Sequence, residues 1–228
     1  MKALPMQAWI CGLVLVSTPA LGGQPAGPLA PITLYSEFEQ GAPEAVRAGL
    51  VDELAQIMSP LGLHFDWHDL RETGEIGASV ELAVITFKGR CNVAGLLPRS
   101  VSPGALGWTH ISDGAILPFS DVDCNRIRLF LQQGLLAVPA AHREEAFGRA
   151  LARVLAHELY HIFADTTRHG SCGVGKEAYT VRDLLSVDFR FEAKESKALK
   201  NSKAYVALEK GGEAQHPEPA WAPQRPPL

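Results

Sequence analysis

A long amphipathic helix constrains the fold of this chain more than any other feature of its sequence. Between residues 143 and 164, apolar side chains recur every three or four residues, the spacing that places them on one face of an α-helix. This apolar face comprises Phe147, Leu151, Val154, Leu155, Leu159 and Ile162. Because such a helix must bury its apolar face against another layer of structure, we expect the rest of the domain to be built around it.

Strand-like and helix-like segments surround this long helix. A strand is expected at residues 32–38, and an amphipathic helix is expected at residues 43–58, between two prolines. Further strand-like runs cover residues 63–67, 80–87, 108–111 and 115–119, and a turn is expected at 112–114. Residues 127–131 fit either a strand or a helix. Shorter helices are expected at 181–186 and 192–208. This order predicts an α+β fold in which a mixed sheet packs on the long helix, beside a small irregular and helical C-terminal lobe.

The first 23 residues have the features of a secretory signal peptide. Lys2 precedes an apolar run at residues 8–16, and small residues follow at 20–23. The apolar run is too short to span a bilayer, so we expect no stable membrane insertion after the signal is cleaved. The sequence therefore predicts a secreted or periplasmic protein.

One domain is expected after the signal peptide. Residues 24–31 have the composition of an extended linker, residues 32–210 hold the predicted elements, and residues 211–228 form a Pro-rich tail that is expected to be disordered. With 46% hydrophobic and 20% charged residues, the chain is neither a multi-span membrane protein nor a disordered one. The formal net charge of -4 gives no electrostatic support for nucleic-acid binding, and no pattern specifies an oligomeric state.

Three cysteines remain once the signal peptide is removed. An exported protein meets an oxidising compartment, so one disulfide and one unpaired thiol are expected. We expect Cys91 to pair with Cys124, because both lie beside strand-like segments, whereas Cys172 lies in a Gly-rich loop. For Cys172, the roles of metal ligand, inhibitory thiolate and small buried residue all stay open.

The long helix also carries a group of residues suited to metal chemistry. His157 and His161 are four residues apart, which places them about 40° apart around a helix, so both imidazoles project from one face and can hold one Zn²⁺. Glu158 lies next to His157, where its carboxylate can hydrogen-bond a water beside the metal. The pattern is the metal-binding arrangement H-E-x-x-H.

A catalytic zinc ion normally takes a third protein ligand and leaves one position open. Asp165 continues the histidine spacing, but along a straight helix it would lie about 12 Å from His157, so we interpret it as a helix-end carboxylate that could orient an imidazole. His169 is the preferred third ligand, because it follows the expected helix end and has a glycine beside it. The alternatives that stay open are Glu177, Asp183 and Cys172.

At these residues the chain resembles the zincin metallopeptidases. The segment His157-Glu158-Leu159-Tyr160-His161, followed eight residues later by His169, looks most like the metzincin group, whose third ligand is a histidine beyond a turn. The order of elements before the helix is also similar, and the resemblance covers about residues 32–190. The chain differs from metzincins in having Ala164 in place of a glycine, a third histidine two residues late, and no methionine after Met58 to form a methionine turn. It resembles a divergent relative of the secreted bacterial type.

This resemblance implies a zincin-like fold and a function. The chain would be a secreted zinc metalloendopeptidase, with Zn²⁺ on His157, His161 and His169, and with Glu158 as the general base for a water activated by the metal. A peptide or protein substrate would lie along an edge strand within residues 107–119, and Tyr179 could donate to the developing negative charge or be an ordinary core or surface tyrosine. Two alternatives stay open: a non-catalytic secreted module that binds zinc or a protein, and a hydrolase of non-peptide amides or esters.

Overall fold

The computed structural model describes residues 32–72, 79, 81–100, 102 and 104–202. The expected signal peptide, linker and C-terminal tail lie outside these residues. In chain order the strands are β1 (Ile32–Phe38), β2 (Phe65–Asp69), β3 (Leu82–Lys88), β4 (Gly107–Ser112) and β5 (Ala115–Asp123). The main helices are α1 (Glu44–Met58), α2 (Cys124–Ala137) and α3 (Arg143–Phe163), followed by α4 (Val181–Leu185) and α5 (Ala193–Lys200). None of the described helices is both long enough and apolar enough to cross a membrane.

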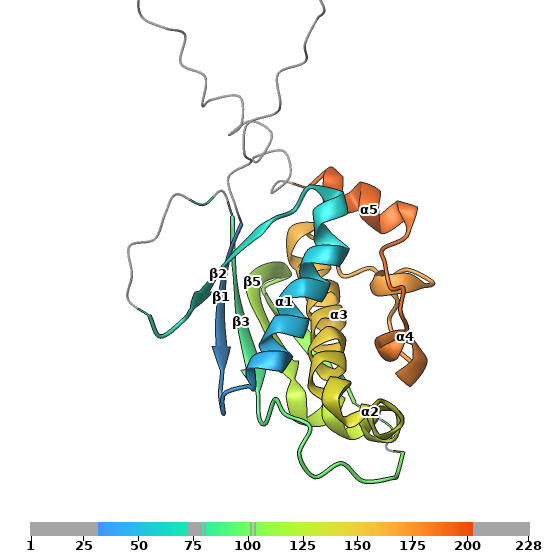
Figure 1. The fold of residues 1–228 in the computed structure, drawn as a ribbon. Helices are drawn as coiled ribbons and strands as arrows, with labels where there is room; N and C mark the ends of the chain where they lie inside the picture. The colour runs from blue at the N-terminus through green and yellow to red at the C-terminus, as the bar shows by residue number, and fades with distance from the viewer. Residues whose placement is uncertain (1–31, 73–78, 80, 101, 103, 203–228) are drawn as a thin grey trace, which may run out of the picture.

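The five strands form one mixed sheet, as the predicted α+β class requires. Their order is β2-β1-β3-β5-β4, and all neighbours are parallel except β4, which runs antiparallel to β5 at the sheet edge. Helices α1 and α3 lie side by side against one face of the sheet, while α4 and α5 lie beyond them (Figure 1). The long helix therefore lies between the sheet and the C-terminal segment.

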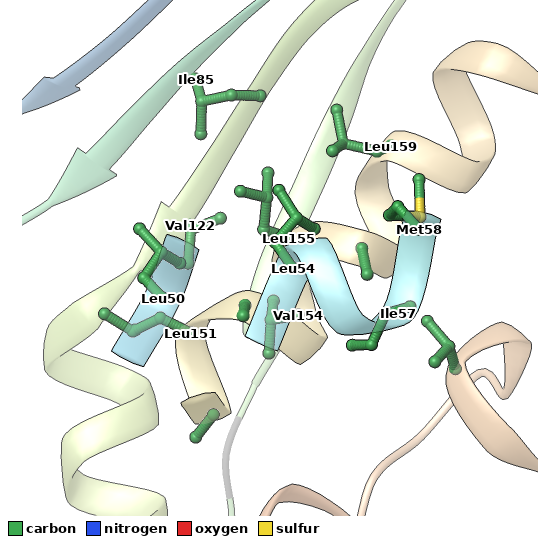
Figure 2. Close-up of a cluster of buried hydrophobic side chains, with 14 of the residues drawn as sticks. Leu50, Leu54, Ile57, Met58, Ile85, Val122, Leu151, Val154, Leu155 and Leu159 are labelled. Atoms are coloured by element: carbon green, nitrogen blue, oxygen red, sulfur yellow. The ribbon is translucent and has the colours of Figure 1, made fainter. Parts of the chain in front are cut away.

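Close packing of α1 on α3 forms the centre of the core. Figure 2 shows Leu50 and Leu54 of α1 pointing toward Leu151 and Leu155 of α3, and all four side chains are buried. The two helices approach closely because each has a glycine at the contact. A Cβ atom added to Gly148 would lie 2.2 Å from the carbonyl oxygen of Val46. Burial of an aliphatic side chain contributes about 1.5–3 kcal/mol, so this apolar contact accounts for much of the helix pairing.

The turn between β4 and β5 was correctly predicted. Asp113 and Gly114 have φ values of 51° and 80°, and a tight hairpin turn requires this left-handed conformation at both central positions. The sequence placed the edge strand within residues 107–119, and the structure assigns the edge to β4 alone, because β5 pairs with β3 on its other side. Trp108 and Phe119, the large aromatic residues of this hairpin, both lie outside the buried core.

Helix α2 settles the ambiguous segment at 127–131 as helical. The Asp123 side chain accepts a 2.9 Å hydrogen bond from the Arg126 amide and so caps the first turn, while Ile127 and Leu131 are buried one turn apart. Cys124 begins this helix and forms the predicted disulfide with Cys91. The disulfide thus ties the loop after β3 to the start of α2.

The C-terminal helix is shorter than predicted. Instead of covering residues 192–208, α5 ends at Lys200, and Asn201 and Ser202 form a turn; residues 203–208 are outside the described part of the chain. Asparagine and serine have low helix propensity, which accounts for the end of the helix at Lys200. Helix α4 starts as predicted at Val181 and ends one residue early, at Leu185.

A buried cation joins α3 to both α1 and the C-terminal segment. The Arg153 side chain on α3 is fully buried, and its Nε donates a 2.7 Å hydrogen bond to the Glu53 carboxylate of α1. Its other nitrogens donate to the carbonyl oxygens of Asp183 and Ser186, each at 2.8 Å, and the guanidinium lies 5.1 Å from the centre of the Phe189 ring. One residue therefore fixes the positions of three segments that are far apart in sequence.

We predict that Glu53→Gln destabilises the protein by about 3–5 kcal/mol, because it leaves the buried Arg153 charge without a counter-ion. Urea unfolding at neutral pH measures the loss. The matched control is Arg149→Met, which removes a half-exposed ion pair with Glu145 on the same helix and should cost less than about 1 kcal/mol. Equal losses in the two variants would contradict the assigned role of the buried pair.

Candidate metal centre

The last turns of α3 place two histidines and a glutamate together. His157, Glu158 and His161 are all at least nine-tenths buried. The helix ends at Phe163, and Asp165 takes a left-handed φ of 46°, which turns the chain back over the helix. His169 then reaches the pair, with its ring centre 5.1 Å from that of His157 and 4.9 Å from that of His161.

These three histidines are positioned to bind a metal ion. Each offers one ring nitrogen, and the three nitrogens all lie within 4.8 Å of one another. They are the three residues that the sequence predicted as ligands. Among the residues that the structure describes, no other group of three or more His, Cys, Asp or Glu side chains has this spacing.

Two backbone carbonyls determine which nitrogen of each helical histidine carries its proton. His157 Nδ1 lies 2.8 Å from the carbonyl oxygen of Val174, and His161 Nδ1 lies 2.6 Å from that of Thr166. A carbonyl oxygen can only accept, so each Nδ1 must donate, and each neutral ring is left with a lone pair on Nε2. The two Nε2 atoms are 3.0 Å apart. Two lone pairs at that distance repel, and a cation that both can coordinate satisfies them, so the residues fit a metal ion.

The loop after α3 is closed on itself and holds these contacts. The amide of Gly170 donates a 2.6 Å hydrogen bond to the carbonyl of Gly175, so the chain next to His169 is tied to the chain next to Val174. The Tyr179 hydroxyl also donates to the Val174 carbonyl. Burial, the largest cause, raises the pKa of Tyr179 well above 10, so the hydroxyl keeps its proton. Tyr179 thus fixes the carbonyl that orients His157.

Burial keeps the imidazoles of His157 and His161 neutral. Desolvation lowers the pKa of His157 to about 4, although the Val174 carbonyl opposes the shift, and the nearby His161 and His169 lower it further. Desolvation also lowers the pKa of His161. Neutral imidazoles are the form that binds metal, so burial preserves the ligands at neutral pH.

Glu158 faces the edge strand of the sheet. The Thr109 hydroxyl of β4 donates a 2.8 Å hydrogen bond to the Glu158 carboxylate and lies 2.9 Å from the Ser120 hydroxyl of β5. Burial raises the pKa of Glu158 to about 7, against the hydrogen bonds from Thr109, which lower it. A Cβ atom at Gly107 would lie 3.0 Å from the Glu158 carboxylate, so the absence of a side chain there lets β4 approach it.

A pocket of about 540 Å³ opens at these residues. It is lined by four parts of the chain: the segment from Gly104 into β4, Ile116 of β5, the last turns of α3, and the loop that holds His169 and Tyr179. His157, Glu158 and His161 all line it. The histidine cluster is therefore open to a ligand from outside.

The alternative third ligands lie elsewhere. Asp183 caps α4 through Thr180 and accepts a 2.6 Å hydrogen bond from Lys176, while Cys172 is a free, exposed thiol in contact with Glu192 rather than a buried residue. Glu177 lines the pocket but is outside the histidine cluster. Asp165 lies at the helix end as expected, but the hydrogen bond that orients the His161 imidazole goes to the carbonyl of Thr166 rather than to the Asp165 carboxylate.

Sequence reasoning missed the residues that support the cluster. Thr166 and Val174 act through their carbonyls, which no residue type reveals, and Thr109 and Gly107 lie about 50 residues before Glu158. The run of glycines at 170, 173 and 175 was the one local signal, since it indicated a tight loop.

We predict that, as the pH falls from about 7.5 to about 5, the free energy of unfolding of the metal-free protein decreases more steeply in Glu158→Gln than in the native protein. The histidine pKa is depressed from 6.5 to about 4 at His157, so acid favours the unfolded state below pH 6.5, by up to about 3 kcal/mol. The Glu158 pKa is raised from 4.5 to about 7, so acid favours the folded state in nearly the same window and offsets the histidines. Urea unfolding tests this, with exposed Glu177→Gln as the control that should leave the slope unchanged.

No protein-family model matches the sequence, and a search of curated proteins found no match. The assignment of a function to this chain therefore rests on the chemistry of the site residues.

Proposed function

We propose that the protein is a secreted, zinc-dependent metalloendopeptidase with a zincin-like fold. The single observation that carries the proposal is the meeting of three histidine ring nitrogens within 4.8 Å of one another, with the Glu158 carboxylate in the same open pocket. The antiparallel edge strand beside this pocket and the long helix beneath it support the zincin-like fold.

Zinc is the proposed metal because the ligand set is three imidazoles. Zn²⁺ is commonly held by neutral histidines, and catalytic zinc sites use three protein ligands with one open position. When bound, the ion would supply a Lewis acid that lowers the pKa of a water molecule and polarises a substrate carbonyl. The Val174 and Thr166 carbonyls, which hold His157 and His161, would keep the ligand rings in place.

Glu158 is the proposed general base. Its carboxylate lies in the pocket and is held in one orientation by the Thr109 hydroxyl. A base with a pKa near the working pH can take a proton from water and then deliver it to the leaving amine, and burial gives Glu158 a pKa of about 7. Tyr179 is not assigned to transition-state stabilisation, because its hydroxyl is engaged by Val174.

Strand β4 is the proposed binding edge for the peptide. Within the described residues it pairs with β5 on one side only, so its other side offers free backbone donors and acceptors. Trp108, Thr109 and Ile111 of β4 also line the pocket. An extended peptide that adds to this edge would pass directly beside Glu158.

Export is the remaining part of the proposal. The Cys91–Cys124 disulfide has both cysteines fully buried, and disulfides persist in oxidising compartments. Together with the signal-like sequence of residues 1–23, this supports a secreted or periplasmic location.

We predict that the purified protein binds about one zinc ion per chain, and that His157→Ala and His169→Ala each abolish stoichiometric binding because they leave two ligands. Metal analysis after dialysis, without chelators during purification, measures this. His110→Ala is the matched control, because His110 is a half-exposed histidine on β4 paired with Asp121. Zinc retained in His169→Ala would refute the third ligand, and a zinc-free native protein would refute the metal site.

We further predict that Glu158→Gln retains zinc but lowers hydrolysis of quenched fluorescent casein by at least about 100-fold, because the amide cannot act as a base. Zinc content and circular dichroism establish that the variant is loaded and folded. A zinc-loaded native protein that is no more active than Glu158→Gln would instead favour the non-catalytic binding module. Hydrolysis of ester but not peptide probes would favour the non-peptide hydrolase.

A further inference from the structure

The described side chains that line the pocket include carboxylates without a lysine or arginine among them. Among the described residues that line it, the carboxylates are Glu158 and Glu177, and none is a lysine or an arginine. Glu158 is buried and hydrogen-bonded to Thr109, and its place beside the metal ligands assigns it to the reaction. Glu177 is exposed to solvent, and its carboxylate has no hydrogen bond or ion pair within the described part of the chain. The negative charge of Glu177 is therefore available to a ligand.

Two cations close to the pocket lining are paired with other groups. Lys176, next to Glu177 in sequence, donates a 2.6 Å hydrogen bond to the Asp183 carboxylate. Arg126 lies behind Gly104 at the pocket wall, but it donates to the Ala105 carbonyl at 3.1 Å and pairs with the Asp123 carboxylate at 3.1 Å. Neither cation neutralises Glu177.

The rest of the pocket lining is largely apolar. It includes Leu106, Trp108, Ile111, Ile116, Val154 and Ala178. Lysine and arginine side chains have an apolar stem that can lie along such a surface, and a charged end that needs a polar partner. The apolar lining could cover the stem of such a side chain, and the unpaired Glu177 carboxylate could pair with its charged end.

We propose that Glu177 selects peptide substrates that carry a lysine or arginine side chain next to the bond to be cleaved. The inference rests on the proposed peptidase function, since it assigns a preference to that same pocket. Glu177 then acts as a specificity residue: its carboxylate pairs with the cationic end of the side chain, while the apolar lining covers the stem.

Binding of amino-acid hydroxamates to the zinc-loaded protein tests the proposal without turnover. The hydroxamate group coordinates zinc, so the lysine, norleucine and glutamate compounds differ only in the side chain that they present to the pocket. Calorimetry on the native protein should give a dissociation constant roughly twofold to fivefold lower for lysine hydroxamate than for norleucine hydroxamate. Because the preference is electrostatic, 0.5 M NaCl should reduce it.

Variants at Glu177 separate charge recognition from structure. Glu177→Gln should make the lysine and norleucine compounds bind equally, and Glu177→Lys should reverse the preference toward the glutamate compound. The control Glu145→Gln, an exposed carboxylate at the start of α3, should behave as the native protein. Internally quenched peptides with lysine, norleucine or glutamate on either side of the cleaved bond should follow the hydroxamates, so that the compound that binds most tightly to each variant corresponds to the peptide with the lowest KM.

The outcomes distinguish this inference from the function on which it rests. A lysine preference that persists in Glu177→Gln, or equal binding of lysine and norleucine hydroxamates to the native protein, would overturn the role of Glu177 alone. Failure of every hydroxamate to bind, with zinc present, would overturn the proposed open metal site and this inference with it.

Discussion

The buried guanidinium of Arg153 is the interaction on which the rest of the structure depends. A charge with no exposed surface must be compensated, and Arg153 obtains its partners from α1 through Glu53 and from the C-terminal segment through Asp183 and Ser186. The chain between the end of α3 and α4 is consequently anchored at both ends. It must close over the last turns of α3, and this places His169 beside His157.

Once the chain is closed in this way, burial sets the charge state of the site. Desolvation acts against whichever form is charged, so it lowers the pKa of His157 and raises the pKa of Glu158. The imidazoles of His157 and His161 therefore keep their lone pairs, and under the proposed function the Glu158 carboxylate is a base matched to neutral pH. The Val174 and Thr166 carbonyls direct those lone pairs at one point.

Sequence reasoning succeeded where the signal was local. The long helix, the first strand, the hairpin turn and the three clustered histidines follow from residue spacing and turn chemistry, and each is present. It failed where the outcome depends on contacts between distant segments. Thr109 contacts Glu158 only because β4 lies at the sheet edge next to α3, a pairing that no local pattern in the sequence reveals.

An open sheet edge is normally a liability, because its free backbone groups invite pairing with other chains. In this structure the edge strand β4 is short, and its register with β5 shifts between Thr109 and Ile111. The regular part, from Gly107 to Thr109, is the part that borders Glu158. Under the proposed function, the free edge is thus confined to the stretch that a substrate must use, and the irregular pairing beyond it limits where any other strand could add.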